Sequence, residues 1–388
     1  MASFDHHVDW TSTDSQVLLN PRWPKEDGER LTELGFAVLR EHGTESSIVL
    51  ASSGTSAGTW REIKLILLKK KSILAAAHSI VSQHQITAKD RLAQTLPDFH
   101  IGGLGTGARA LLSGAKLVDL RESGWQTQNF LRAAKEGLVT IVSLVPTQLF
   151  DLVTSESRPW PELRIVFIGG AELSRDLEKR ARTLGWPLVV TYGMTETSAM
   201  IAAREEANPD LGFRALPGVQ WDLEGTTGKL KLKTASLADG FARADVSGLT
   251  WSPLLNPEGW FVTEDQGQRG QPGRFFVLGR DRDQIKINGE NVNLAPLRQS
   301  LESILQGRAL NFRNFHLTSV PDPRSGHRIV LFAAEHGDLS ELQQHYNQRV
   351  LPFERIQEIF PVLEIPRTDL GKVRDQELVA QALAKGIK

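Results

Sequence analysis

The fold is decided by the segment Leu188-Val-Val-Thr-Tyr-Gly-Met-Thr-Glu-Thr197, in which a short apolar run passes directly into a polar turn. The apolar run has the length and composition of a strand buried on both faces. Gly193 permits a tight turn beside a ligand, and Tyr192 offers a flat face to a purine base. Thr195 and Glu196 supply the hard oxygens that a Mg²⁺ bridging phosphates prefers. The same turn also fits an ordinary strand-to-helix junction, with Thr195 as the cap and Glu196 complementing the helix dipole.

The region before this segment alternates between strand and helix patterns. We expect strands at 47–51, 116–120, 139–145, 163–168 and 187–191, and helices at 72–83, 128–135, 147–153 and 174–184. This alternation predicts an α/β fold with a largely parallel, doubly wound sheet, whose ligand site lies beyond the carboxyl ends of the strands. Small or polar residues follow those ends, namely Ser53, His100, Ser143, Gly169 and Thr191.

The pattern changes after residue 210. Residues 228–233 alternate with period two and residues 261–279 are rich in glycine, so we expect a β-rich subdomain of antiparallel strands. Beyond it, a helix at 294–305, a strand at 328–334 and a helix at 339–349 predict a compact α+β unit. With the linker placed at 279–282, we predict a large N-terminal domain, 1–280, and a small, mobile C-terminal domain, 281–388.

Composition narrows the class of protein. The 388 residues are 40% hydrophobic and 23% charged, with a formal net charge of -1, which argues against a nucleic-acid partner and favours a small molecule. Cysteine is absent, which excludes a thiolate nucleophile and cysteine-ligated metals. No apolar stretch is long enough to span a membrane and the N-terminus lacks the pattern of a signal peptide, so we expect a cytoplasmic protein.

Several segments, in this order, resemble those of the acyl-adenylate-forming superfamily, which includes acyl-CoA synthetases, adenylation domains and luciferases. The first is the small-residue turn at 52–58, whose backbone N–H groups would wrap a triphosphate; its matching residues are Ser53, Gly54, Thr55, Ser56 and Gly58. The superfamily places a lysine soon after these glycines. Lys64 is the best counterpart here, and Arg61 is a rival for that role.

Three further segments match the nucleotide site of the superfamily. The resemblance implies that Gly170 and Ala171 line the adenine. It also implies that Tyr192, Gly193 and Met194 contact the nucleotide, and that Thr195 and Glu196 act in catalysis, with Glu196 on Mg²⁺. In the segment 259–265, Asp265 would accept both ribose hydroxyls. Glu264 departs from the pattern, because most members carry glycine there.

The last two matches lie in the C-terminal part. In the segment 279–292, Arg280 would bind ribose or phosphate, Arg282 occupies the hinge position, and Gly289 resembles the turn that lines the channel for CoA. The loop at 365–374 looks like the catalytic lysine loop, in which Lys372 delivers positive charge to the α-phosphate. A surface lysine near a frayed terminus is the plain alternative for Lys372.

Within the superfamily, the segments 96–104 and 142–149 are most similar to the o-succinylbenzoate:CoA ligases of menaquinone biosynthesis. The implied acid pocket is apolar with a few polar groups, which fits an aryl acid. His100, Ser143 and Thr197 are its candidate residues, although His100 could also be a gate or a core histidine. The residue that would pair with a second carboxylate is not identified by the sequence.

The resemblance implies a magnesium-dependent ligase that joins a carboxylic acid to AMP and then transfers the acyl group to CoA. Members usually carry roughly a hundred more residues before the phosphate loop, so we expect a shortened N-terminal region. Either a partner subunit replaces the missing layer, for which exposed apolar surface would favour a homodimer, or the enzyme is a minimal version. Two alternatives stay open within the superfamily: a carrier protein as the acceptor, and a non-catalytic adenylate-binding relative. A distant alternative is an NAD-dependent oxidoreductase, since the glycines of the segment 103–107 mimic a dinucleotide fingerprint.

Overall fold

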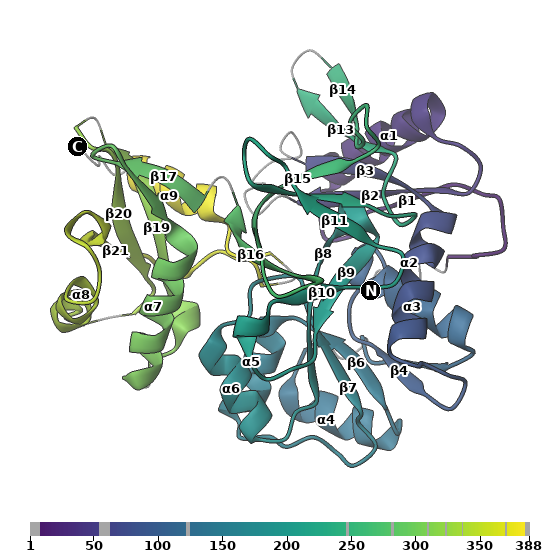
Figure 1. The fold of residues 1–388 in the computed structure, drawn as a ribbon, viewed down its shortest axis with the longest axis horizontal. Coiled ribbons are helices and arrows are strands. Elements are labelled where there is room, and N and C mark those ends of the chain that lie inside the picture. The colour runs from purple at the N-terminus through teal and green to yellow at the C-terminus, as the bar shows by residue number, and fades with distance from the viewer. Residues whose placement is uncertain are drawn as a thin grey trace.

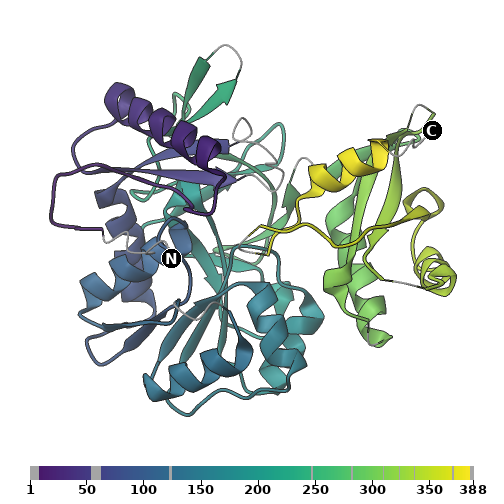
Figure 2. The same ribbon diagram turned by 180° about the vertical axis from the view of Figure 1, so that it is seen from behind.

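The computed structural model describes residues 8–53, 63–121, 125–245, 248–280, 283–308, 310–322, 324–335, 337–368 and 371–384. The chain forms a large lobe up to about residue 280 and a small lobe that follows it (Figure 1). The same arrangement is seen from behind in Figure 2, where the C-terminal segment crosses from the small lobe toward the large one and back. In the described residues, no helix combines the length and the apolar character that crossing a bilayer requires.

An 11-stranded mixed sheet forms the centre of the large lobe. Its parallel strands are β4 (Arg91–Gln94), β5 (Lys116–Asp119), β6 (Ile141–Leu144), β7 (Ile165–Ile168) and β8 (Leu188–Met194), in the order β5-β4-β6-β7-β8. Its antiparallel strands are β9 (Ala199–Arg204), β10 (Phe213–Ala215), β11 (Gln220–Leu223), β12 (Lys229–Lys233), β15 (Phe261–Arg269) and β16 (Arg274–Arg280). The predicted α/β class with a parallel sheet and a β-rich part is confirmed, and both parts share one continuous sheet.

Alternating side chains explain why helices cover both faces of the parallel strands. Ile141, Ile165 and Phe167 face α2 (Lys70–Gln83) and α3 (Ile101–Ser113). Val142 and Val166 face the other layer, which consists of α4 (Thr127–Glu136), α5 (Pro146–Thr154) and α6 (Arg175–Thr183). This two-sided burial is why these strands are almost uniformly apolar.

A second sheet has five strands, β1 (Gln16–Leu18), β2 (Ser47–Ser53), β3 (Ile63–Lys69), β13 (Gly240–Asp245) and β14 (Gly248–Pro253). One of its faces packs on α2 and α3, and the other is covered by α1 (Lys25–His42). The prediction placed residues 47–51 in the parallel sheet, whereas β2 pairs antiparallel with β3 in this separate sheet. An isolated strand pattern does not specify its partners, and here they are the preceding strand β1, which is parallel, and the next strand β3.

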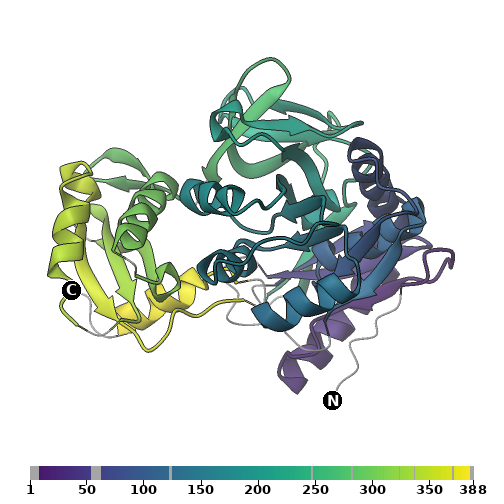
Figure 3. The same ribbon diagram turned by 90° about the horizontal axis from the view of Figure 1, so that it is seen from below.

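The small lobe has its own cores. A three-stranded sheet, β19 (Phe315–Asp322), β20 (Gly326–Ala333) and β21 (Ile356–Pro361), packs one face on α7 (Leu294–Gly307) and α8 (Ser340–Asn347). Its other face is covered by α9 (Asp375–Ala384). The hairpin of β17 (Gln284–Ile287) and β18 (Glu290–Asn293) joins the first core. Figure 3 shows the two lobes from below.

Candidate functional site

The carboxyl ends of the parallel strands carry the predicted glycines. Gly169 and Gly170 follow β7, and Gly170 has φ +84°. A Cβ at Gly169 would lie 2.5 Å from Thr191 Oγ1, whose hydroxyl donates to the backbone oxygen of Ile168 at 2.9 Å. Gly170 and Ala171 are solvent-exposed, so their backbone can approach a ligand closely.

The turn after β8 is tightly specified. A Cβ on Gly193 would lie 2.0 Å from the backbone oxygen of Ala199, so no other residue fits there. Thr197 is fully buried, and its hydroxyl accepts from the N–H of Met194 at 3.0 Å and lies 2.9 Å from the oxygen of Met194. Ala199 has φ +105°, a conformation that is strained for a residue with a side chain. These bonds fix the shape of the turn that presents Thr195 and Glu196.

Tyr192, Asp265 and Arg280 form a connected group beside this turn. The Tyr192 hydroxyl donates to Asp265 Oδ2 at 2.6 Å, and Arg280 Nε donates to Asp265 Oδ1 at 3.1 Å. Asp265 and Arg280 are direct cross-strand neighbours of β15 and β16, and Asp265 is buried. Burial, together with the Asp265 carboxylate, raises the pKa of Tyr192 above its usual value. The carboxylate is held in one orientation and keeps lone pairs for further donors.

Lys64 lies between two carboxylates. Its ammonium is 3.8 Å from Glu196 Oε1 and 3.4 Å from Glu264 Oε1, and it sits 4.9 Å from the centre of the Phe241 ring. Burial raises the pKa of Glu264, but the positive charges of Lys64, Arg280 and Arg243 together outweigh it, so the net pKa is lowered. Arg280, which donates to Asp265, also lowers the pKa of Glu264 by its charge, so this group and the Tyr192 group are neighbours. Of the two predicted candidates for the lysine position, Lys64 is described and Arg61 lies outside the described residues.

Arg109 is a site residue that the sequence interpretation missed. It lies on α3, is 2% exposed, and donates from Nη2 to Thr106 Oγ1 at 2.7 Å and to Ser143 Oγ at 3.0 Å. No carboxylate among the described residues pairs with it, and its Nε has no hydrogen-bond partner. Burial lowers the pKa of Arg109 to about 10, so it stays charged at neutral pH. The sequence did contain a sign of this residue, because Arg109 is the one charged residue in the otherwise apolar segment 101–113.

Two of the three predicted acid-pocket residues, His100 and Ser143, lie beside this helix. His100 is the residue before the first turn of α3 and stacks at a tilt on Phe99, with 4.6 Å between ring centres. Ser143 is the third residue of β6 and binds Arg109. Thr197 instead uses its hydroxyl inside the β8 turn. The glycines at 103–107, offered as a dinucleotide fingerprint, lie inside the helix α3 and form no phosphate-binding turn.

The Lys372 loop reaches the large lobe. A Cβ on Gly371 would lie 2.6 Å from the side chain of Thr147, at the start of α5 and directly beyond β6. The loop is closed by a hydrogen bond from Thr368 N to Lys372 O at 2.7 Å and one from Gly371 N to Thr368 O at 2.8 Å. The structure therefore places Lys372 on the side of the molecule where the parallel strands end.

Some predicted residues are not tested by this geometry. Residues 54–62, with Gly54, Thr55, Ser56 and Gly58, lie outside the described part of the chain, as does the hinge candidate Arg282. Ser53 is the last residue of β2. Gly289, with φ +86°, and Asn288, with φ +53°, form the two-residue turn of the β17–β18 hairpin, which requires left-handed conformations.

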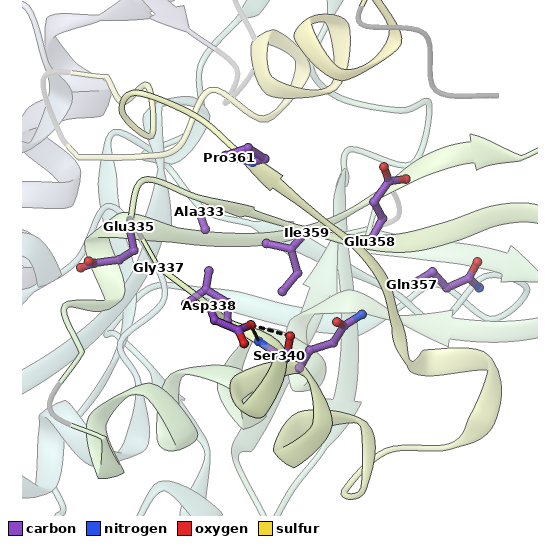
Figure 4. Close-up of a pocket in the computed structure, with 11 residues that line it drawn as sticks. Ala333, Glu335, Gly337, Asp338, Ser340, Gln357, Glu358, Ile359 and Pro361 are labelled. Atoms are coloured by element: carbon purple, nitrogen blue, oxygen red, sulfur yellow. Dashed lines mark hydrogen bonds between the residues drawn. The ribbon is translucent and has the colours of Figure 1, made fainter.

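A cavity of about 440 Å³ lies in the small lobe, between β21 and the start of α8 (Figure 4). Its carboxylates have partners in that lobe: Asp338 accepts from Ser340, Glu335 from Asn314, and Glu358 pairs with Arg328. The cavity is built from elements that do not carry the residues described above, and we assign it no role.

Comparisons with known proteins agree with this geometry. Residues 50–235 match the model of the AMP-binding enzyme family. The indoleacetate–CoA ligase of Aromatoleum aromaticum is 27% identical over 372 residues, which cover 92% of this chain and 71% of that protein. The 2-succinylbenzoate–CoA ligase of Salmonella typhimurium is 29% identical over 270 residues, 69% of this chain and 55% of that protein. The chain thus spans only part of the length of these relatives.

Solved structures share the fold. The o-succinylbenzoate CoA synthetase of Bacillus subtilis, in complex with its acyl-adenylate intermediate, superposes with a TM-score of 0.74 at 21% identity, over 93% of this chain and 78% of that one. The same synthetase in complex with ATP and magnesium gives a TM-score of 0.73 at 20% identity, over 94% and 79%. The arrangement of a large mixed-sheet lobe and a small α+β lobe is therefore one that this chain shares with them.

Proposed function

Because residues 50–235 are a domain of the AMP-binding enzyme family, we propose that this chain is an AMP-forming acid:CoA ligase. It activates a carboxylic acid as the acyl-adenylate, with release of pyrophosphate, and then transfers the acyl group to the thiol of CoA. The observation that carries the proposal is the Tyr192–Asp265–Arg280 group, set beside the Lys64 and Glu196 pair at the ends of the parallel strands.

The nucleotide fits these residues by charge and shape. Asp265, fixed by two donors, accepts the ribose hydroxyls, and the exposed backbone at Gly170 and Ala171 lies against the base. Lys64 faces the phosphates, and Glu196 is the hard-oxygen ligand that would hold Mg²⁺, which would neutralise phosphate charge. Lys372 brings a second cation from the small lobe to the α-phosphate, where negative charge grows as pyrophosphate leaves.

The acid is proposed to carry a second carboxylate, as o-succinylbenzoate does. Arg109 supports this choice, because a buried guanidinium with an unpartnered Nε and no described carboxylate is suited to a charged ligand group. Its hydrogen bonds to the hydroxyls of Ser143 and Thr106 orient the guanidinium group. The relatives that act on 2-succinylbenzoate point to the same acid.

A second candidate acid is indoleacetate. The relative named for it matches more of this chain than the 2-succinylbenzoate ligase of Salmonella typhimurium does. Indoleacetate has no second carboxylate, so it would leave Arg109 without a counter-charge in a buried site. We therefore rank it below o-succinylbenzoate.

We also propose that the chain divides into domains at 1–280 and 281–388. The small lobe encloses two apolar cores of its own, which supports its independence. Arg282, outside the described residues, is the proposed hinge through which the small domain vacates the cleft for the thiol of CoA.

Pyrophosphate release measured with ATP, Mg²⁺ and a panel of acids tests the proposal. We expect release with o-succinylbenzoate, weak release with benzoate and indoleacetate, and formation of the thioester when CoA is added. A carrier-protein thiol in place of CoA tests the alternative acceptor. No release with any aryl acid, together with a shift of the melting temperature by ATP, would instead identify a non-catalytic adenylate-binding protein.

A further inference from the structure

The two lobes meet through the segment that precedes β19. Phe312 packs edge-on against Phe150 of α5, with ring centres 4.5 Å apart and an interplanar angle of 85°. The next residue, Arg313, places Nη1 3.2 Å from Asp151 Oδ1 and 3.5 Å from Oδ2. Adjacent residues of the small lobe thus contact adjacent residues of one helix in the large lobe, by an aromatic pair and an ion pair.

The acceptor of this ion pair is oriented in advance. Trp125 Nε1 donates to Asp151 Oδ2 at 2.9 Å, and the Trp125 ring packs on Phe130 of α4. The side chains of Asp151 and Arg313 are 25% and 36% exposed, so solvent screens the pair only in part. A carboxylate already held by an indole loses little freedom when the guanidinium arrives.

Arg367 connects the ion pair to the Lys372 loop. Its Nη2 donates to the backbone oxygen of Arg313 at 3.0 Å, and its Nη1 donates to the backbone oxygen of Gly371 at 2.9 Å. Gly371 precedes Lys372 and lies against Thr147, one turn before Asp151 on α5. A continuous set of contacts therefore runs from α4 and α5, through Arg313 and Arg367, to the backbone next to Lys372.

The other end of the lobe interface is less favourable. Glu172, in the loop before α6, and Glu302 of α7 both lie at this end. Burial, with the like charge of Glu172, raises the pKa of Glu302, although a hydrogen bond with Ser174 opposes this. Gln299 of α7 donates to Glu172 there. Two carboxylates in one interface oppose its closure at neutral pH, whereas the contacts at α5 pair opposite charges and two aromatic rings.

We propose that Asp151 and Arg313, with the Phe150–Phe312 pair, form a latch that positions the Lys372 loop on the large lobe for the adenylation step. The effect of the latch on adenylation rests on the proposed function. Its effect on the distance between the two lobes does not. Arg313 and Asp151 are positioning residues, because they act on Lys372 through Arg367 and the backbone of Gly371.

The kinetic test separates the two half-reactions. We expect Asp151→Asn and Arg313→Gln each to slow acid-dependent pyrophosphate release about 5- to 30-fold, as the loss of about 1–2 kcal/mol of orienting interaction implies. Thioester formation from preformed acyl-adenylate and CoA should change less than about twofold. The charge exchange Asp151→Arg with Arg313→Asp should recover at least part of the lost rate. The control is Glu33→Gln, which removes the ion pair of Arg30 and Glu33 on α1 at a similar distance of 3.1 Å.

A second measurement needs no activity. Since the chain lacks cysteine, labels on Lys135→Cys of α4 and Leu351→Cys of the small lobe, both exposed, report the distance between the lobes by pulsed electron resonance. We expect one narrow distance distribution in the parent chain and a broader one after Asp151→Asn or Arg313→Gln, with Glu33→Gln unchanged.

Two results overturn the latch: an unchanged distance distribution in both variants, or equal loss of both half-reactions with no recovery in the charge exchange. If the parent chain releases no pyrophosphate with any acid but the distribution still broadens in the variants, the proposed function fails and the latch stands as an interlobe contact. Broadening accompanied by selective loss of adenylation supports both.

Discussion

The proposed nucleotide site, around Asp265, and the proposed acid site, around Arg109, differ in how their buried polar groups are paired. At the nucleotide end, the polar side chains satisfy one another: Tyr192 and Arg280 both donate to Asp265. At the acid end, Arg109 is as buried as Asp265 but has two hydroxyls as partners, an unpartnered Nε and no described carboxylate.

The difference shows what each end requires of its ligand. A satisfied polar group is rigid before the ligand arrives, so it suits a constant substrate such as a nucleotide. A buried charge without a counter-charge costs free energy in the empty protein, and a carboxylate that enters recovers that cost. Specificity for the acid is therefore expected to reside in Arg109, and catalytic alignment of the nucleotide in Asp265.

Breaking the nucleotide end should have the largest effect. In Asp265→Asn one carboxylate oxygen becomes an amide N–H₂, which cannot accept a hydrogen bond. Either Tyr192 or Arg280 therefore loses its acceptor. We expect kcat/KM for ATP to fall more than about 100-fold with every acid, since charged hydrogen bonds contribute about 1.5–3 kcal/mol each. Initial rates of pyrophosphate release at varied ATP measure this. Asp222→Asn, which alters an exposed carboxylate of β11, is the control and should behave as the parent chain.

Breaking the acid end should be selective. We expect Arg109→Met to lower kcat/KM for o-succinylbenzoate about 30- to 100-fold and for benzoate less than about threefold, because only the former loses a charged partner. The free energy of unfolding should stay equal or rise, since a buried unpaired charge is removed.

A matched variant completes this contrast. Arg204 is also buried, but it pairs with Glu178 at 2.6 Å. Arg204→Met should destabilise the fold without changing the ratio of activities on the two acids. Equal losses on o-succinylbenzoate and benzoate in Arg109→Met would show that Arg109 is structural.

The free energy of unfolding should depend on pH through His84, which lies close to Arg109. His84 packs on Phe167, as Arg109 does, and burial, with the charges of Arg109 and Arg164, lowers the pKa of His84 to about 4. The unfolded chain then binds a proton that the folded chain does not between pH 6.5 and 4, so stability falls as the pH falls through this window. Across the whole window this contributes about 3 kcal/mol to the free energy of unfolding.

Urea denaturation at pH 7 and pH 4.5 measures this slope. We expect His84→Gln to reduce the loss of stability between these two values, whatever its effect at pH 7. The nearby Glu205, 3.3 Å from His84 Nδ1, would favour protonation, and its side chain is 56% exposed. A slope as steep in His84→Gln as in the parent chain would show that other groups dominate this window.

The smallest effect is expected at the phosphate side. Glu264→Gln releases Lys64 from one of its two carboxylates, so Lys64 should turn to the nucleotide more readily. We expect the KM for ATP to fall about two- to threefold with kcat nearly constant, because a partly exposed ion pair contributes about 0.5 kcal/mol. Glu258→Gln, exposed in the preceding loop, is the control. A higher KM for ATP would mean that Glu264 aids nucleotide binding.

Elements with a strong local pattern were predicted well from the sequence. The strands at β6, β7 and β8 and the helices α2, α4 and α6 agree with the prediction to within a few residues, because each is an uninterrupted apolar run or a clear helical period. Three helices were missed, α1, α3 and α9. The first four residues of α3 include two glycines, and the apolar stripe of α1 is diluted by charged residues, so neither pattern stood out.

The candidate site divides in the same way. Gly193, Asp265, Arg280 and Lys372 were predicted from short motifs, in which the neighbours in sequence are also the neighbours in space. The contact of Lys64 with Glu264 joins residues 200 positions apart, and that of Arg313 with Asp151 joins residues 162 positions apart. No local pattern encodes such pairs.

By itself, the sequence determined the α/β class, the order of the motifs and the residue types at the nucleotide site, because these depend on local periodicity and on short turns. Only the tertiary structure decided that β2 belongs to a second sheet, that Arg109 is buried beside Ser143, and that α5 holds the Lys372 loop. The physical reason is that burial and pairing are properties of surfaces brought together by folding, and a side chain's charge has no cost or use until its neighbours are fixed.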